Sequence, residues 1–87
     1  MEAVNAEIKA EMASSLGRAG RAVEDSLARL KDPGLVASLG REVLLREAAD
    51  AVWKFFIQRE AMGLRDTSMA IRDFGIPRAV IVRLGAR

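Results

Sequence analysis

Residues 4–30, VNAEIKAEMASSLGRAGRAVEDSLARL, carry the clearest structural pattern in this chain of 87 residues. Its apolar residues recur about every 3.7 positions, which is close to the period of an α-helix. Charged residues occupy the opposite side, and the stripe keeps its phase through two glycines. We therefore predict one long helix over residues 2–31. The stripe consists of Val4, Ile8, Met12, Leu16, Ala19, Val23, Leu27 and Leu30.

Two glycines, Gly17 and Gly20, lie inside this predicted helix. Each is less favourable there than Ala by about 1 kcal/mol. The close approach of another helix could offset that penalty, since a glycine lets two backbones come near each other. We expect the small residues of segment 14–20 to form such a crossing.

The strongest interruption of the helical pattern is KDPG, residues 31–34. A proline after an aspartate is typical of a turn or of the first position of a new helix. Residues 34–39 are predicted to form a separate helical turn, because Val36 and Leu39 fall on the far side of the helical wheel of the segment that follows.

A second long helix is predicted to begin near Gly40 or Arg41, to end at about Met62 and to be capped by Gly63. Segment 51–57, AVWKFFI, is apolar nearly all round, which is typical of a helix that is covered on several sides. The residues that share its main apolar face are Leu45, Ala48, Ala49, Val52, Phe55 and Phe56.

Two short helices are predicted at the C-terminus. Asp66 or Thr67 is a suitable N-cap for the first, which ends near Phe74. The second is predicted over residues 77–84, opened by its proline. We expect a single all-α domain over residues 1–87, with a long antiparallel helical hairpin followed by these two helices.

The wide apolar arc of the second long helix exceeds what packing between two helices requires. A second copy of the chain would cover the remainder, giving a homodimer with a four-helix-bundle core. The alternative is a monomer that covers itself with its C-terminal helices.

The composition excludes several classes of function. The chain has no Cys and no His, so disulfides and the usual zinc, haem and iron–sulfur sites are excluded, as are Ser–His and Cys–His nucleophiles. We expect no cofactor and no metal. No apolar run approaches the ~20 residues of a membrane span, and the N-terminus lacks the pattern of a secretory signal. We expect a cytoplasmic, bacterial-type protein without membrane contact.

Carboxylates are the only acid–base groups available. The pairs Glu7/Glu11 and Glu47/Asp50 are spaced to meet on helix faces, yet both faces are predicted to be exposed. Solvated carboxylates have ordinary pKa values and are poor general acids, so we expect no catalytic residue and no enzyme. An aromatic stripe around Trp53 is interpreted as core, with a floor for an apolar ligand as the alternative.

Arg59 falls near the centre of the apolar face of the second long helix, one turn beyond Phe55. A charge in that position needs a partner. We expect a structural ion pair with Asp66 or Asp73, or a guanidinium that reaches the last carbonyls of its own helix. The alternative is an anion-binding arginine beside a pocket.

Residues 67–84 are similar to the helix-turn-helix of bacterial DNA-binding proteins. Phe74, Gly75 and Ile76 match the turn, and residues 59–87 carry 6 Arg against 3 acidic residues. The match departs from the motif where Ile71 replaces a small residue, and its second helix is short. The residues that would face DNA are Pro77, Arg78, Ala79, Val82 and Arg83, of which only Arg78 and Arg83 are candidate nucleic-acid contacts.

Two stretches, AVWKFFIQREAMGLRD (residues 51–66) and DFGIPRAVIVRLG (residues 73–85), resemble a family of short, uncharacterised bacterial proteins of unknown function. A weaker similarity lies around SSLGRAGRAV, residues 14–23. The resemblance implies a small all-helical protein. It brings no known activity, so no functional residue is carried over.

We therefore expect a small non-enzymatic interaction or scaffold protein that acts as a homodimer. The alternative is a DNA-associated protein that uses residues 67–84. Burial of all three residues Val80, Ile81 and Val82 would prevent the last helix from entering a DNA groove.

Overall fold

The computed structural model describes the backbone of residues 2–85 and the side chains of residues 5–85. This part of the chain forms five α-helices and contains no strand, so the predicted all-α class is confirmed. None of its helices is both long enough and apolar enough to cross a membrane. The helices are α1 (Glu2–Leu30), α2 (Pro33–Leu39), α3 (Arg41–Ala61), α4 (Thr67–Phe74) and α5 (Arg78–Ile81).

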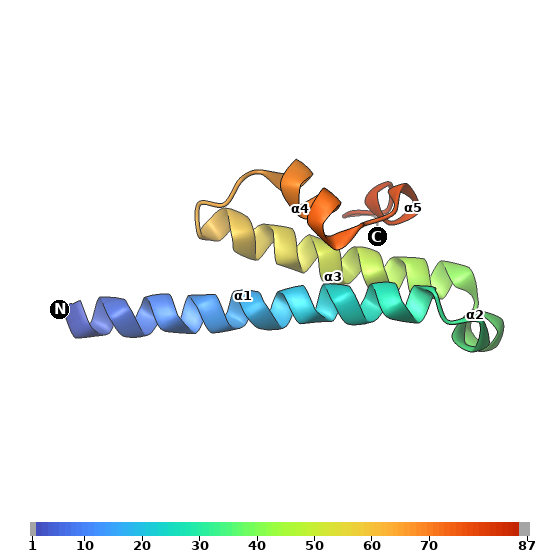
Figure 1. Cartoon of the computed structure of the whole chain (residues 1–87), viewed down its shortest axis with the longest axis horizontal. Coiled ribbons are helices and arrows are strands. Elements are labelled where there is room, and N and C mark those ends of the chain that lie inside the picture. Colours follow the sequence, from blue (N-terminus) through green and yellow to red (C-terminus); the bar gives the residue numbers. More distant parts are fainter. Residues whose placement is uncertain (1, 86–87) are drawn as a thin grey trace.

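The two long helices form the predicted antiparallel hairpin. Figure 1 shows α1 and α3 side by side, α2 at the bend that joins them, and α4 and α5 returning along α3. The N-terminal turns of α1 extend beyond the end of α3. The molecule is therefore elongated, with principal dimensions of 52 × 24 × 22 Å.

Local capping residues set the bend between the long helices. The Asp32 carboxylate accepts hydrogen bonds from the backbone N–H groups of Gly34 (2.9 Å) and Leu35 (3.3 Å). Pro33 occupies the first position of α2, where its missing N–H has no cost. Gly40 then adopts φ +90°, a conformation suited to glycine, and separates α2 from α3. The predicted break between these two helices is thus confirmed.

The hydrophobic core lies between α1, α3 and the C-terminal helices. Val23, Leu44, Val52 and Val80 are almost completely buried, and burial of each such side chain contributes about 1.5–3 kcal/mol. The predicted stripe of α1 is buried only in its C-terminal half. The side chain of Val4, the first member of that stripe, lies outside the described residues.

Gly20 marks the place where α1, α3 and α4 meet. A Cβ atom added there would lie 3.5 Å from Phe55 Cε1 and 3.6 Å from Phe74 Cζ. The two phenyl rings pack on each other with their centroids 4.9 Å apart. Gly17 is exposed, so of the two glycines only Gly20 takes part in the predicted crossing.

The last helix is shorter than predicted. It ends at Ile81 instead of Leu84, because the N–H groups of Arg83 and Leu84 bond to carbonyls only three residues back. The N–H of Arg83 donates to Val80 at 3.0 Å and that of Leu84 donates to Ile81 at 3.1 Å. Such bonds tighten the chain into turns, and Gly85 then reverses it at φ +71°.

Candidate interaction surface

A shallow groove of ≈ 490 Å³ follows the joint between α1 and α3, and we call it the α1–α3 groove. Small side chains from both helices leave this space open. The α3 side chains Ile57 and Trp53, which contribute to its lining, are 50% and 39% exposed. Its lining residues are Ser15, Arg18, Ala19, Ala22, Ala51, Trp53, Lys54, Ile57 and Gln58.

One hydrogen bond crosses the α1–α3 groove. The side-chain amide of Gln58 donates to the hydroxyl of Ser15. The amide oxygen of Gln58 is buried and has no hydrogen-bond partner among the described residues. A buried polar atom without a partner is unfavourable by about 1–3 kcal/mol.

The N-terminal turns of α1 form a second exposed region, residues 5–11, which we call the α1 overhang. Every side chain of this segment is exposed, including that of Ile8 at 51%. Ile8 belongs to the same stripe that packs against α3 further along the helix, so an apolar position of α1 is left uncovered.

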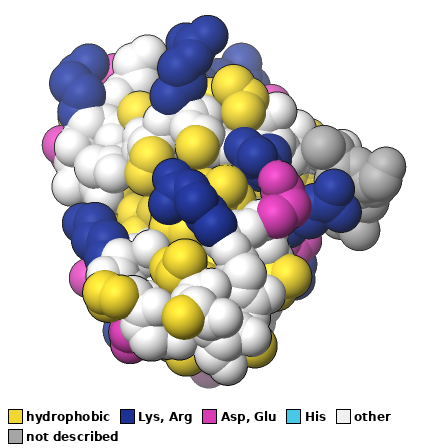
Figure 2. Space-filling model, turned by 90° about the vertical axis from the view of Figure 1, so that its right-hand side faces the viewer, with side chains coloured by type: hydrophobic (Ala, Val, Ile, Leu, Met, Phe, Trp, Pro, Cys, Tyr) yellow, Lys and Arg dark blue, Asp and Glu magenta, His cyan; other side chains and the backbone are white. Residues whose placement is uncertain are grey.

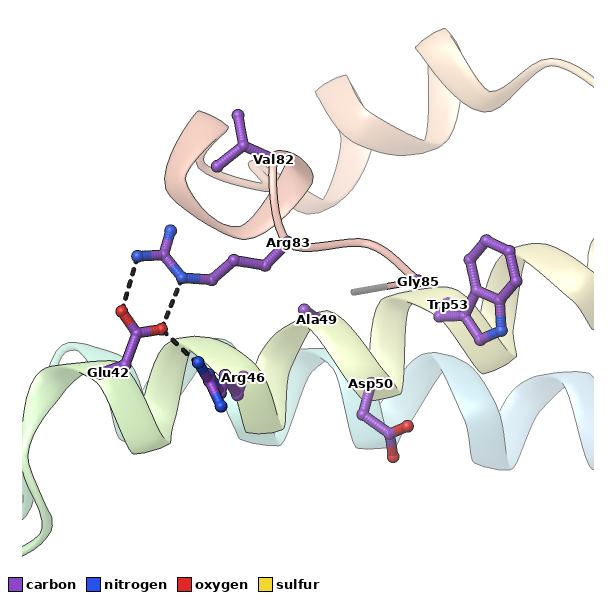
Figure 3. A pocket seen from close by; sticks show the side chains of 8 residues that line it. All are labelled: Glu42, Arg46, Ala49, Asp50, Trp53, Val82, Arg83 and Gly85. Carbon is purple, nitrogen blue, oxygen red and sulfur yellow. Dashed lines mark hydrogen bonds and ion pairs between the residues drawn. The ribbon is translucent and has the colours of Figure 1, made fainter. Parts of the chain in front are cut away.

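A pocket of ≈ 630 Å³ lies on α3 beside the C-terminal segment. Figure 3 shows the Arg83 guanidinium facing the Glu42 carboxylate at one end of the pocket. Trp53 lies at the opposite end. Arg83 donates from Nε to Oε2 (2.7 Å) and from Nη2 to Oε1 (2.9 Å) of Glu42. Arg46 approaches the same carboxylate at 3.4 Å.

These contacts favour the charged forms of both groups. Hydrogen bonding from Arg83 lowers the pKa of Glu42 to about 2, and the Glu42 carboxylate raises the pKa of Arg83. The pair therefore acts as a clamp that ties the C-terminal segment to the first turn of α3. Sequence reasoning missed it, because the two residues are 41 positions apart and no local pattern links them.

The predicted ion pair of Arg59 with Asp66 or Asp73 is wrong, because no such pair forms within the described part of the chain. Arg59 instead donates from Nη2 to the backbone carbonyl of Asp66 at 3.2 Å. Its guanidinium carbon lies 5.7 Å from the centroid of the Phe55 ring, within the range of a cation–π contact. The Asp66 carboxylate is engaged elsewhere, since it accepts from the Met69 N–H at the start of α4.

Among the described residues, three of the four carboxylates considered for acid–base chemistry, all except Glu7, take part in surface ion pairs. Glu47 bonds to Arg29 Nε at 2.7 Å, and Glu11 lies 3.4 Å from Arg18 Nη2. Asp50 lies 3.0 Å from Lys54 Nζ. Within residues 5–85, no group of three or more acidic side chains is placed to share a metal ion.

The aromatic residues divide between core and surface. Phe55 is buried and Phe56 is half-buried, whereas Trp53 contributes to the walls of both the pocket and the α1–α3 groove. The three rings therefore do not form the floor of one common ligand site.

The helix-turn-helix candidate is incomplete in the structure. Gly75 caps α4 in the left-handed conformation, as the motif requires, but α5 has only 4 residues. Val80 is buried, Ile81 is half-buried and Val82 is 61% exposed, so the segment is not covered on all sides. Of the two candidate nucleic-acid contacts, Arg78 is exposed, whereas Arg83 is bonded to Glu42.

The surface at the α2 end of the molecule is mixed in character. Figure 2 shows hydrophobic side chains lying between Lys and Arg side chains on this face. The basic groups are separated and do not form one continuous patch. Arg87, the last base of the predicted basic tail, lies outside the described residues.

These features define a small protein built on an antiparallel helical hairpin, with a groove between its two long helices and a pocket beside its C-terminal segment as candidate sites. The chain belongs to the family of unknown function DUF6665, which it matches over residues 1–87. The resemblance noted from the sequence is thereby confirmed as far as the family is concerned. No curated protein and no solved structure matches the chain.

Proposed function

We propose that this protein is a small, non-enzymatic interaction module that acts as a homodimer. Sequence reasoning adds the expectation of a cytoplasmic location. The observation that supports the proposal is the large uncovered surface of the single chain, to which the α1–α3 groove and the α1 overhang both contribute.

The surface area supports this proposal quantitatively. The chain exposes 5980 Å², whereas a compact monomer of this mass is expected to expose roughly 5000 Å². Its radius of gyration is 14.8 Å, against about 12 Å for a compact domain of this length. The excess area is comparable to the ~800 Å² that each partner buries in a standard interface.

Sedimentation equilibrium over a range from low to high micromolar concentration tests the proposal. We expect a mass of twice the single chain, with dissociation at the lowest concentrations. A single-chain mass at every concentration would contradict the homodimer.

The DNA-associated function is the second candidate. It is supported by the exposure of Arg78 and Val82 at the C-terminal helix pair. It is weakened by the shortness of α5 and by the engagement of Arg83 with Glu42.

Fluorescence anisotropy of mixed-sequence duplex DNA distinguishes the two candidates. Phosphate contacts would give micromolar binding that weakens steeply with salt, and Arg78→Ala would reduce it more than Lys9→Ala on the α1 overhang. We expect no binding at low salt, which would eliminate the DNA-associated function.

A further inference from the structure

The α1 overhang and the α1–α3 groove lie along the same line of α1. Ile8, Ser15 and Ala22 are seven residues apart, a spacing at which side chains almost superimpose on a helix. Ser15 and Ala22 line the groove, so Ile8 lies on the same side of α1, beyond the end of the groove. The overhang and the stretch from Ser15 to Ala22 both measure about 10 Å along the helix axis at 1.5 Å per residue.

Charge is distributed in a complementary way between these two regions. The overhang contains Glu7 and Glu11 with one base, Lys9. The groove is lined by Arg18 and Lys54 and by no acidic residue. Within one chain Arg18 lies 3.4 Å from Glu11 and Lys54 lies 3.0 Å from Asp50. These pairs are exposed at the surface, so association exchanges the intrachain partner of Arg18 for the same residue of a second copy.

The pattern is also self-complementary, which a two-fold dimer requires. When two α1 helices run antiparallel about an axis between Ser14 and Ser15, Glu11 of one copy comes level with Arg18 of the other. In the same register, Ile8 of one copy comes nearly level with Ala22 of the second copy. The two differ by one residue, about 1.5 Å along the helix axis. Both relations occur twice, once on each side of the axis.

We infer that the α1–α3 groove receives the α1 overhang of a second copy of this chain, and that the two copies exchange overhangs about a two-fold axis at Ser14 and Ser15. This inference rests on the proposed homodimer and specifies its interface. Each Ile8 side chain fills the other copy's groove near Ala22 and Ala51. Glu11 and Arg18, which pair with each other within the single chain, exchange partners at the rim, so that Glu11 of each copy pairs with Arg18 of the other.

A charge-swap experiment tests the register. In a homodimer of Glu11→Arg, the new arginine of each copy faces Arg18 of the other. In a homodimer of Arg18→Glu, the new glutamate of each copy faces Glu11 of the other. Each variant alone therefore places like charges opposite each other. We expect the dissociation constant of each variant to rise tenfold or more at low salt. An equimolar mixture should form a heterodimer with near wild-type affinity, because every base then faces an acid.

The double variant Glu11→Arg/Arg18→Glu is the matched control, because it restores both reciprocal pairs in one chain and should self-associate like the wild type. Circular dichroism of each variant checks that it remains helical. A wild type that is monomeric would overturn the homodimer itself. A dimeric wild type whose mixed variants fail to form heterodimers would overturn only the register.

The apolar part of the interface is tested separately with Ile8→Asp and Val82→Asp. Ile8 and Val82 are exposed to similar extents, 51% and 61%, but only Ile8 belongs to the proposed interface. We expect Ile8→Asp to shift the protein to monomers and Val82→Asp to leave the dimer intact. Equal effects of the two substitutions would overturn the proposed placement of Ile8.

Discussion

Gly20 shows how the absence of one side chain allows three helices to pack. The rings of Phe55 and Phe74 occupy the space beside its backbone, at ordinary van der Waals distance from the point that a Cβ atom would occupy. The packing therefore accepts one methyl group there but has no space for a longer side chain.

We predict opposite outcomes for two substitutions at this position. Gly20→Ala should leave stability unchanged or raise it by up to ~1 kcal/mol, because Ala favours a helix interior. Gly20→Leu should destabilise the protein by about 1–3 kcal/mol, because it overpacks the site against both phenyl rings. Urea unfolding followed by circular dichroism measures both, with Gly17→Ala as the exposed control. Equal destabilisation by Ala and Leu at position 20 would contradict the packing described.

Glu42 is the residue with the clearest predicted pH dependence. Its pKa in the folded protein is about 2, below the ordinary value of 4.5, so its contribution to stability is fully present above pH 4.5. That contribution is lost as the pH falls through the folded pKa. We therefore expect the Glu42–Arg83 clamp to weaken between about pH 4.5 and pH 2.

The single tryptophan of the chain reports on this change. A Cβ added to Gly85 would lie 3.6 Å from the ring of Trp53, so release of the C-terminal segment should alter the fluorescence of Trp53. The wild type should show a transition in the acid range that Glu42→Gln lacks, whereas Glu7→Gln should retain it. Identical acid profiles for wild type and Glu42→Gln would show that the clamp does not control this segment.

At the scale of the element, short-range signals were sufficient to locate most helix ends. Asp32 with Pro33, and Asp66 before α4, are local capping patterns that act through the nearest backbone N–H groups. The end of α5 was placed too late, although the turns that follow it are also local: the N–H groups of Arg83 and Leu84 bond to carbonyls three residues back. In this same segment the Arg83 side chain bonds to Glu42 of another helix, a contact that no capping pattern indicates.

The cap of α4 gives a prediction for a single element. The Asp66 carboxylate accepts from the Met69 N–H at 3.1 Å, and loss of an N-cap is typically unfavourable by about 1 kcal/mol. Asp66→Ala should lower the free energy of unfolding by about that amount, and Asp66→Asn should retain most of it. Asp73→Ala, at an exposed position without a cap role, is the control. An equal loss in both alanine variants would contradict the assigned role of Asp66.

At the scale of the whole molecule, elongation is the dominant feature. The 52 Å length arises because α1 continues past the end of α3, which leaves Ile8 of its apolar stripe exposed. A dimer that covers this region links folding to association, because the partner binds the folded chain and not the unfolded one.

We therefore expect the thermal midpoint to rise with protein concentration in the wild type. Ile8→Asp should abolish this dependence, since it removes the contact that links folding to association. Differential scanning calorimetry at concentrations that differ by about a hundredfold measures the effect. A midpoint that does not change with concentration in the wild type would argue that folding is independent of a second copy.

The helical class, the order of the elements and the hairpin follow from the sequence alone, because helical periodicity and capping are encoded in residues a few positions apart. The same reasoning placed Arg59 on the apolar face of α3 and named Asp66 as a partner, but it assigned the contact to the carboxylate. The tertiary structure was needed to show that Arg59 bonds to the backbone carbonyl of Asp66 instead, and that Glu42 bonds to Arg83. Those choices depend on which side chains converge in space, and no local pattern records a convergence of residues 41 positions apart.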